Sequence, residues 1–291
     1  MSAAEMKGLD KLRSMHEVLE ESGIEGSARD AELILTHSLG IGRADLYRDN
    51  PDIDESAGAE IDRLVQRRVQ REPLQYILGY TEFCGLKIMV GPGVLIPRPE
   101  TEILAEKAKE VMRGKDWGHS SQKPLAFLDL CTGSGCLAIA LARAFPTVEV
   151  YGTDISEKAL EYARGNAELN GVKNVTFLLG DLFVPVRNML FDMIVSNPPY
   201  IRTADIGSLQ PEISDWEPVE ALDGGAEGMD YYERITSGAI EQLKSRGPLM
   251  MEIGEGQSDA VRRLCEVAGF VHVSLIKDYA GIDRIVIAGK E

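Results

Sequence analysis

The tetrapeptide Asn-Pro-Pro-Tyr, Asn197 to Tyr200, follows an apolar run of strand length and carries the residue types for chemistry at nitrogen. Its two prolines lack N–H donors and hold the chain extended, which leaves the carbonyl of the Asn197 side chain and the backbone carbonyl of Pro198 as acceptors. Two acceptors suit a planar NH2 group, and Tyr200 offers an aromatic face for a flat amide or base. We predict Asn197, Pro198 and Tyr200 as catalytic and, with Pro199, as substrate-binding residues.

The physical reason for such a pair of acceptors is the weak nucleophilicity of an amide or aniline-like nitrogen, whose lone pair is delocalised. Accepting both N–H bonds localises the lone pair and aims it at an electrophile. The gain comes largely from orientation and from preorganised dipoles.

A second motif is a glycine-rich loop, where residues 129–135 read DLCTGSG after another apolar run. Glycines allow a tight turn and a close approach to a ligand at the start of a helix. Asp154 ends the next apolar run and suits two ribose hydroxyls, while Asp181 ends the third and suits an exocyclic amine. These three strand ends together indicate an adenosine site.

Two kinds of adenosine cofactor fit the loop. Gly133, Gly135 and Ala138 satisfy the GxGxxG/A pattern of a nicotinamide dehydrogenase. A pyrophosphate at a helix start is disfavoured by a nearby acid, however, and Asp129 stands directly before the loop. An acid suits the ammonium and sulfonium charges of S-adenosylmethionine, which is therefore the predicted cofactor.

The elements that position these residues alternate in type from residue 124 onward. Seven apolar runs of strand length are separated by helical segments, which predicts an α/β fold with a doubly wound, Rossmann-like, mainly parallel sheet. Ligands of such sheets bind at the carboxyl ends of the strands, where the motifs above fall. The last two runs, VHVSLIK and DRIVIAG, are joined by only five residues, so they must pair antiparallel.

The segment before this sheet predicts a small helical domain. Met6, Leu9, Leu12, Met15 and Leu19 share a helical stripe over 5–20; a second helix is expected between an N-cap at Ser27 and a stop at Gly40, and a third over 55–71. We predict three regions: residues 1–80 as a helical docking domain, 81–123 as a hairpin around Gly85 with a connecting helix and a linker at 114–123, and 124–291 as the cofactor domain.

Four arginines mark the third helix, at positions 63, 67, 68 and 71. They form either a solvated face paired with nearby acids or a docking surface for an acidic or RNA-like partner. Arg98 and Glu100, in the segment LIPRPETE at 95–102, either close over the pocket or form a structural ion pair.

Composition excludes several classes of function. The 291 residues carry a net charge of −16, and the 11 basic and 17 acidic residues of positions 1–90 leave that part at −6. Direct binding of nucleic acid requires clustered cations, so it is not expected. No apolar run approaches the roughly 18 residues of a membrane span and the amino terminus lacks a signal-peptide core, which predicts a cytoplasmic protein. The four cysteines form no CxxC pair, and no metal site is predicted.

The motifs DLCTGSG, GTDIS, GDLF and SNPPYI together resemble the bacterial protein-(glutamine-N5) methyltransferases, the PrmC/HemK family. The resemblance extends through EPLQYILGYTEFCGL, LIPRPETE, PEISDWEPVEALDGGAEG, MEIGEGQ and DYAGIDRIV. It implies a seven-stranded methyltransferase fold and, as substrate, the glutamine in the GGQ motif of class-I peptide chain release factors. It implies cofactor contacts from Cys131, Thr132, Gly133, Ser134, Gly135, Asp154, Asp181, Leu182 and Asn197, with leucine at 182 where some relatives have an aromatic residue.

Two alternatives remain open from sequence. Adenine's exocyclic amine poses the same geometric problem as the glutamine amide, so an N6-adenine DNA methyltransferase shares the motif, although the charge balance disfavours it. The other alternative is a non-catalytic module that binds the cofactor and docks a translation factor. An intact NPPY disfavours that reading, because a protein without chemistry needs no paired acceptors.

Overall fold

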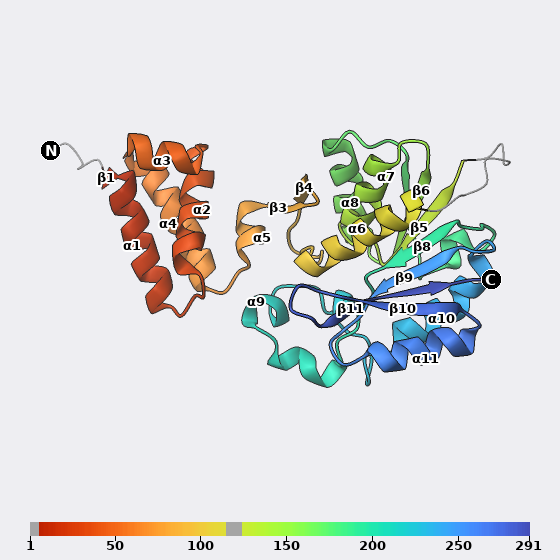
Figure 1. Cartoon of the computed structure of the whole chain (residues 1–291). Coiled ribbons are helices and arrows are strands. Elements are labelled where there is room, and N and C mark those ends of the chain that lie inside the picture. Colours follow the sequence, from red (N-terminus) through yellow and green to blue (C-terminus); the bar gives the residue numbers. More distant parts are fainter. Residues whose placement is uncertain (1–5, 115–123) are drawn as a thin grey trace. The chain divides into compact units, whose positions relative to one another are not determined.

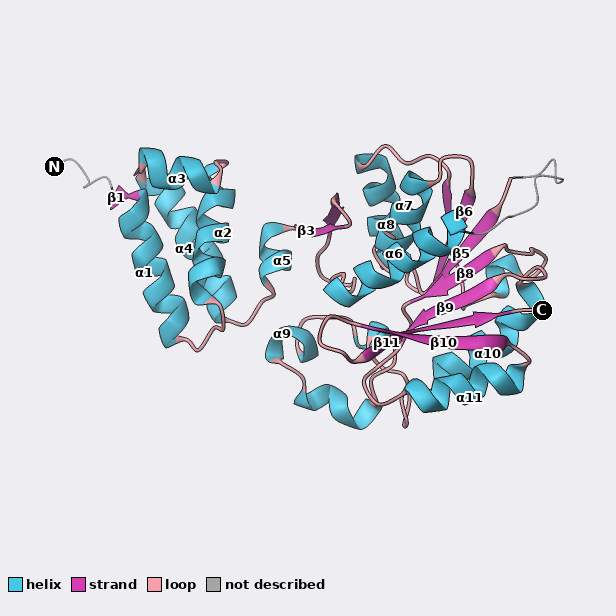
Figure 2. Ribbon diagram, in the orientation of Figure 1, coloured by secondary structure: helices cyan, strands magenta, loops and turns pink. Residues whose placement is uncertain are grey.

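The computed structural model describes residues 6–114 and 124–291, shown in Figures 1 and 2. The chain forms two compact units: a helical unit that runs up to Tyr80 and also contains Gln210–Trp216, and a catalytic unit made of Thr81–Leu209 and Glu217–Glu291. The linker predicted at 114–123 lies, apart from Gly114, outside the described residues. Within the described ranges, no helix is both long and apolar enough to cross a bilayer.

The helical unit is a bundle around one apolar core (Figure 2). Its elements are β1 (Met6–Lys7), α1 (Gly8–Glu21), α2 (Ser27–Leu39), α3 (Arg43–Asp49), β2 (Asp52–Ile53), α4 (Glu55–Val69) and α5 (Leu74–Leu78), with α9 (Pro211–Ser214) from the later segment. Met15 and Leu19, four residues apart on α1, meet Ile34 and Leu35 of α2 and Ile61 of α4 in the core. Residues four apart share a helix face, so the apolar stripe seen in the sequence is the buried one.

Two details of the predicted helices were wrong. Met6 pairs with Ile53 between β1 and β2 instead of opening the first helix. Ser27 is the first residue of α2 and Gly26, with φ 73°, precedes it, so the Ser27 hydroxyl does not cap the helix. The predicted stop at Gly40 is confirmed, because Gly40 adopts φ 64° after Leu39.

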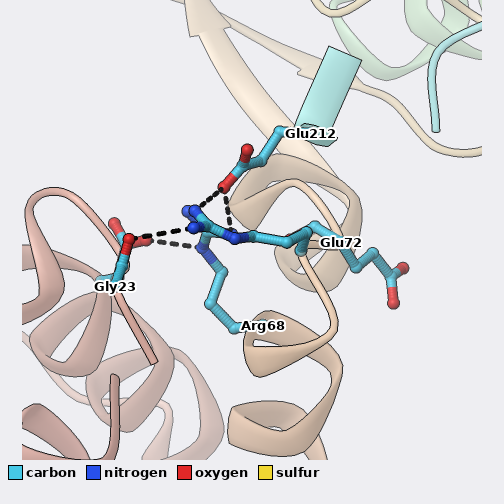
Figure 3. A network of polar contacts seen from close by, with 6 residues as sticks. Gly23, Arg68, Glu72 and Glu212 are labelled. Atoms are coloured by element: carbon cyan, nitrogen blue, oxygen red, sulfur yellow. Dashed lines mark hydrogen bonds and ion pairs between the residues drawn. The ribbon is translucent and has the colours of Figure 1, made fainter. Parts of the chain in front are cut away.

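The four arginines in and just after α4 pair with acids inside the helical unit, as the first of the two sequence interpretations expected, but the solvated face of that interpretation does not include Arg68. Arg68 is buried; its guanidinium donates to Asp30 at 2.7 Å and to Glu212 at 2.9 Å. Arg71 donates to the same Glu212 oxygen at 3.1 Å and to the Gly23 carbonyl at 3.1 Å. Figure 3 shows Arg68 and Glu212 in this network. The other two arginines also have carboxylate partners, Glu60 for Arg63 and Glu72 for Arg67.

The catalytic unit is built on a seven-stranded sheet in the order β10-β11-β9-β8-β5-β6-β7. Its strands are β5 (Ala126–Leu130), β6 (Glu149–Asp154), β7 (Val175–Leu179), β8 (Met193–Ser196), β9 (Pro248–Glu252), β10 (Val271–Lys277) and β11 (Asp283–Gly289). β11 is antiparallel to β10 and β9, while the other pairs are parallel. The predicted fold class is therefore confirmed, including the antiparallel final hairpin.

Helices cover both faces of this sheet (Figure 1). One face carries α6 (Pro99–Gly114), α7 (Cys136–Ala144) and α8 (Glu157–Leu169); the other carries α10 (Asp230–Gln242) and α11 (Ser258–Ala268). Side chains alternate along a strand, so Leu128 and Leu130 join the apolar core beneath α10 and α11 while Asp129 turns toward α7. The remaining short elements are β3 (Tyr80–Phe83), β4 (Leu86–Met89), η1 (Val184–Val186), η2 (Thr203–Ser208) and η3 (Val219–Ala221).

The register of the parallel strands brings the predicted functional residues to one edge. Leu130 lies opposite Thr153 on one side and Ser196 on the other. Ser196 in turn lies opposite Met251, so the residues that follow, Asn197 and Glu252, end neighbouring strands.

Candidate active site

A cavity of about 400 Å³ opens at this carboxyl edge, within the size range of small-molecule sites. The residues predicted to bind the cofactor gather in its wall, with one exception. The wall includes Cys131, Thr132, Gly133, Ser134, Asp154, Asp181, Leu182 and Asn197. The exception, Gly135, lies outside the wall.

Gly135 supports the loop rather than facing the cavity. Its φ is 77°, and a Cβ placed there would come within 2.9 Å of Ala163 Cβ and of the Phe177 ring. Only glycine satisfies both the left-handed backbone and this close approach of loop to helix and strand. The position therefore sets how the loop sits on the sheet.

Asp154 fixes the loop from the neighbouring strand. Its carboxylate accepts the N–H of Gly133 at 2.8 Å and the N–H of Ser156 at 2.9 Å. Burial raises the pKa of this carboxyl above its usual value, and the backbone donors oppose that shift. The acid predicted to bind ribose hydroxyls is thus held in one orientation at the cavity wall.

Asp129 lies deeper, and burial raises its pKa to about 7 against the bonds it accepts from the Thr132 hydroxyl and the Ala138 N–H. Both bonds use the same carboxylate oxygen, Oδ2. The buried hydroxyl of Thr153 has no partner among the described residues, and Thr153 lines the same cavity. A buried acid and an unpaired hydroxyl fit a cationic, polar ligand such as S-adenosylmethionine.

Asp181, at the third predicted strand end, already has a partner within the protein. Asp181 is half exposed and forms an ion pair through its Oδ2 with Arg234 of α10. Leu182 is buried at the cavity wall with φ 45°, and the Tyr231 ring lies in the same wall. The adenine-binding prediction for Asp181 and Leu182 is consistent with this placement in the wall but is not tested by it.

The NPPY tetrapeptide stands between this cavity and a smaller one of about 30 Å³. Asn197 lines both cavities, Pro199 lines the larger, and Pro198 and Tyr200 line the smaller. Asn197 thus lies at the boundary between the two cavities, together with Leu95 and Ala221.

Several residues around the tetrapeptide were not foreseen. Thr101 and Glu252 are buried directly behind it, and their hydrogen bonds reach Asn197 and Tyr200. Gly224 lies so near that a Cβ would be 2.7 Å from Tyr200 Cα. Thr101 and Glu252 stood inside quoted motifs, LIPRPETE and MEIGEGQ, but only the packing of α6 against the end of β9 shows that they converge.

Arg98 forms a structural ion pair, the second of the two interpretations offered for it, but its carboxylate partner is Glu217 and not Glu100. Its guanidinium donates to Glu217 at 2.7 Å, and the other Glu217 oxygen accepts the Ile96 N–H at 3.4 Å. Burial raises the pKa of Glu217 while the Arg98 charge lowers it. Leu95 and Pro97 of the same segment line the larger cavity, as does Pro218 beside Glu217.

No group of three or more His, Cys, Asp or Glu side chains among the described residues is arranged to hold a metal ion. Burial raises the pKa of the Cys131 thiol well above its ordinary value, so this thiol at the cavity wall stays protonated.

Comparison with solved structures shows the fold alone. The chain resembles a methyltransferase from Pyrococcus furiosus, with a TM-score of 0.51 and 21% identity over 71% of this chain and 90% of that one. It also resembles the 16S rRNA N2 G1207 methyltransferase of T. thermophilus, solved with AdoMet and guanosine, with a TM-score of 0.51 and 20% identity over 73% of this chain and 50% of that one.

Sequence comparison reaches further than the fold. A family model described as the PrmC N-terminal domain matches residues 10–79, and one described as a methyltransferase domain matches residues 121–276. The release factor glutamine methyltransferase of Thermodesulfovibrio yellowstonii is 44% identical over 285 residues, covering 98% of this chain and 99% of the relative. That of Geobacter sulfurreducens is 44% identical over 270 residues, covering 92% and 91%. With similarity of this extent in both units, the chain belongs to the release factor glutamine methyltransferase family.

Proposed function

We propose that this methyltransferase transfers a methyl group from S-adenosylmethionine to the side-chain amide nitrogen, N5, of the glutamine in the GGQ motif of class-I peptide chain release factors. The observation that carries the proposal is the position of Asn197 in the walls of both cavities. A methyl donor in the larger space and an amide entering by the smaller one would meet beside its side chain.

S-adenosylmethionine supplies a methyl group made electrophilic by the positive charge on its sulfur. On this proposal the loop from Cys131 to Gly135 and the Asp154 carboxylate hold the sugar and amino-acid parts. Asp129 offsets the cationic charge of the amino-acid end, since an opposite charge in a buried site is strongly felt. Asp181 and Leu182 take the adenine.

The remaining residues act on the glutamine. Asn197 Oδ1 and the Pro198 carbonyl each accept one N–H of the amide, which localises its lone pair toward the methyl group. Pro198 and Pro199 are buried, so the second acceptor is a fixed dipole. The Tyr200 ring, which lines the smaller cavity, provides the flat surface beside the amide plane.

The helical unit is the proposed docking element for the release factor. The relatives are named for this substrate, and the match to the PrmC N-terminal domain covers residues 10–79. The net charge of −6 over residues 1–90 favours a basic protein partner over nucleic acid. We place the enzyme in the cytoplasm, with its substrate and without direct contact to nucleic acid or membrane.

The two alternatives gain no support from a specific observation. For an adenine methyltransferase acting on DNA, the net charges along the chain are the wrong sign. For a non-catalytic module, the buried support behind Asn197 and Tyr200 would have no purpose.

The experiment offers unmethylated release factor, a ribosomal protein and duplex DNA side by side with labelled cofactor. Mass spectrometry of the release factor should find one methyl group on the glutamine of the GGQ motif. A release factor with that glutamine changed to alanine is the matched control and should stay unlabelled. Label on DNA adenine or on the ribosomal protein, with none on the release factor, would reject the proposed substrate.

A further inference from the structure

Two buried polar side chains, Thr101 and Glu252, stand in line behind the proposed catalytic asparagine. The Asn197 Nδ2 group donates to the Thr101 hydroxyl oxygen at 3.0 Å. That hydroxyl donates to Glu252 Oε2 at 2.7 Å. Thr101 is 2% exposed and Glu252 1% exposed, so water does not compete for these bonds.

The direction of these bonds follows from counting protons. When Glu252 is ionised, its carboxylate has only lone pairs and must receive the single proton of the Thr101 hydroxyl. Thr101 then presents lone pairs to Asn197, and only the NH2 end of the asparagine amide can satisfy them. The amide oxygen, Oδ1, is thereby turned the other way, and no donor among the described residues reaches it.

We propose that Thr101 and Glu252 are positioning residues that hold the Asn197 side chain with its oxygen facing the substrate amide. Without them a rotated amide would present NH2 to the incoming NH2, and two donors would face each other. The inference rests on the proposed function of Asn197, and it adds the reason why that side chain faces one way.

The same carboxylate also fixes the other end of the tetrapeptide. Glu252 Oε1 accepts the Tyr200 hydroxyl at 3.2 Å, so one side chain aligns both the acceptor and the aromatic wall. The Tyr200 carbonyl is held by the Gln257 side chain at 2.9 Å. The geometry is local to the sheet edge, because Ser196 and Met251 are paired and Asn197 and Glu252 follow them.

The closest matched test replaces Thr101 by valine, which keeps the branched shape but removes the hydroxyl. At saturating cofactor and release factor, we expect kcat to fall about 10- to 100-fold, by analogy with the loss of a hydrogen-bond partner that orients a metal ligand. KM for the release factor should change at most about threefold. Thr101→Ser keeps the hydroxyl and should stay within about threefold of the wild-type kcat. Thr236→Val, at a buried threonine of α10 bonded to its own helix, controls for burying valine.

A second readout does not depend on turnover. In a ¹⁵N-labelled enzyme, the Asn197 side-chain NH2 signals are assigned by their loss in Asn197→Ala. One of the two protons should be protected from exchange with solvent in the wild type and in Thr101→Ser. Its exchange should quicken at least about tenfold in Thr101→Val, whether or not the release factor is the substrate.

A double variant tests whether Thr101 and Glu252 act through one connected chain of hydrogen bonds or independently of each other. Glu252→Gln should also lower kcat, and Thr101→Val combined with Glu252→Gln should lose little more than the worse single variant. If Thr101→Val turns over like the wild type, if Thr101→Ser is as slow as valine, or if the two losses multiply, the positioning role is wrong. If instead the wild type leaves the release factor unlabelled while the NH2 protection behaves as expected, only the substrate assignment is wrong. Should the valine variant fail to fold, the Glu252→Gln and serine variants decide.

Discussion

The carboxylate of Asp154 accepts the backbone N–H of Gly133 at 2.8 Å, which ties the end of β6 to the glycine-rich loop after β5. The acid predicted to hold a ribose therefore also shapes the loop that is predicted to contact the rest of the cofactor. The Asp154 carboxylate is preorganised for this predicted role, since its orientation is set before any ligand binds.

Replacing Asp154 by alanine should weaken binding of S-adenosylmethionine by about 1–3 kcal/mol, because ribose hydroxyls lose their acceptor and the loop loses an anchor. Titration calorimetry measures the effect. Asp154→Asn keeps one acceptor oxygen and should lose less than alanine. Wild-type affinity in the alanine variant would remove Asp154 from the cofactor site.

Asn197→Ala should lower kcat about 10²- to 10³-fold, the range found when one preorganised hydrogen-bonding group of an active site is deleted. Cofactor affinity should stay within about tenfold, because the ribose and adenine contacts lie elsewhere in the wall. Single-turnover measurements separate the chemical step from product release.

Asn197→Asp sharpens the test of the site. An aspartate has no N–H for the Thr101 hydroxyl and brings a second acid near Glu252, so it should turn over no faster than the alanine variant. An aspartate variant as fast as the wild type would contradict the role given to the asparagine NH2 group.

Affinity for S-adenosylmethionine should fall as the pH is lowered below about 7, because burial raises the pKa of Asp129 to about 7. Above that pH the carboxylate is charged and attracts the cationic ligand; below it the neutral acid does not. The dissociation constant should rise by up to tenfold per pH unit below the pKa of the free protein. Asp129→Asn should bind more weakly and lose this dependence, as binding titrations at pH 5.5–8.5 would reveal.

Glu252 provides a contrast in the same pH range, because burial also raises its pKa to about 7. The groups that face it are the Thr101 and Tyr200 hydroxyls, the like charge of Glu100 on α6 and the positive charge of Arg284 on β11. Its protonation should act on kcat at saturating cofactor, since it disturbs Asn197 rather than the cofactor. A kcat that falls at low pH in Glu252→Gln as it does in the wild type would contradict this separation.

Gly135→Ala should destabilise the catalytic unit by about 1–3 kcal/mol, because a Cβ at φ 77° would press on Ala163 and Phe177 at 2.9 Å. Urea unfolding measures the loss. Gly165→Ala is the matched control on the exposed side of α8, where nothing lies within 4 Å, and it should stabilise by about 0.5–1 kcal/mol. Equal effects of the two substitutions would show that crowding at Gly135 has no cost.

The fold and the carboxyl edge of the sheet, where the motif residues lie, were predictable because the sequence patterns that indicate them are local. Each strand appears as an apolar run, and Asp129, Asp154 and Asn197 stand at the ends of such runs, so parallel pairing alone brings them together. The short helix α3 was missed, since seven residues give too little periodicity to predict a helix.

What remained beyond sequence reasoning depends on long-range register and on backbone strain. Thr101 meets Asn197 from 96 positions away and Glu252 from 151, and neither spacing is visible without the sheet. Cys131 and Leu182 take left-handed backbone conformations, with φ 57° and 45°, that side chains other than glycine seldom adopt. Neither cysteine nor leucine is a residue type that predicts a left-handed conformation.

Because Gln210–Trp216 belongs to the helical unit, that unit is completed late during synthesis on the ribosome. Arg68 emerges 144 residues before its partner Glu212, an interval on the order of ten seconds at typical elongation rates. Within the segment that ends at Tyr80, the partners of these two guanidinium groups include the Asp30 carboxylate for Arg68 and the Gly23 carbonyl for Arg71. The helical unit therefore leaves the ribosome first but lacks the Glu212 carboxylate of its buried charge network. That carboxylate is translated only after most of the parallel sheet.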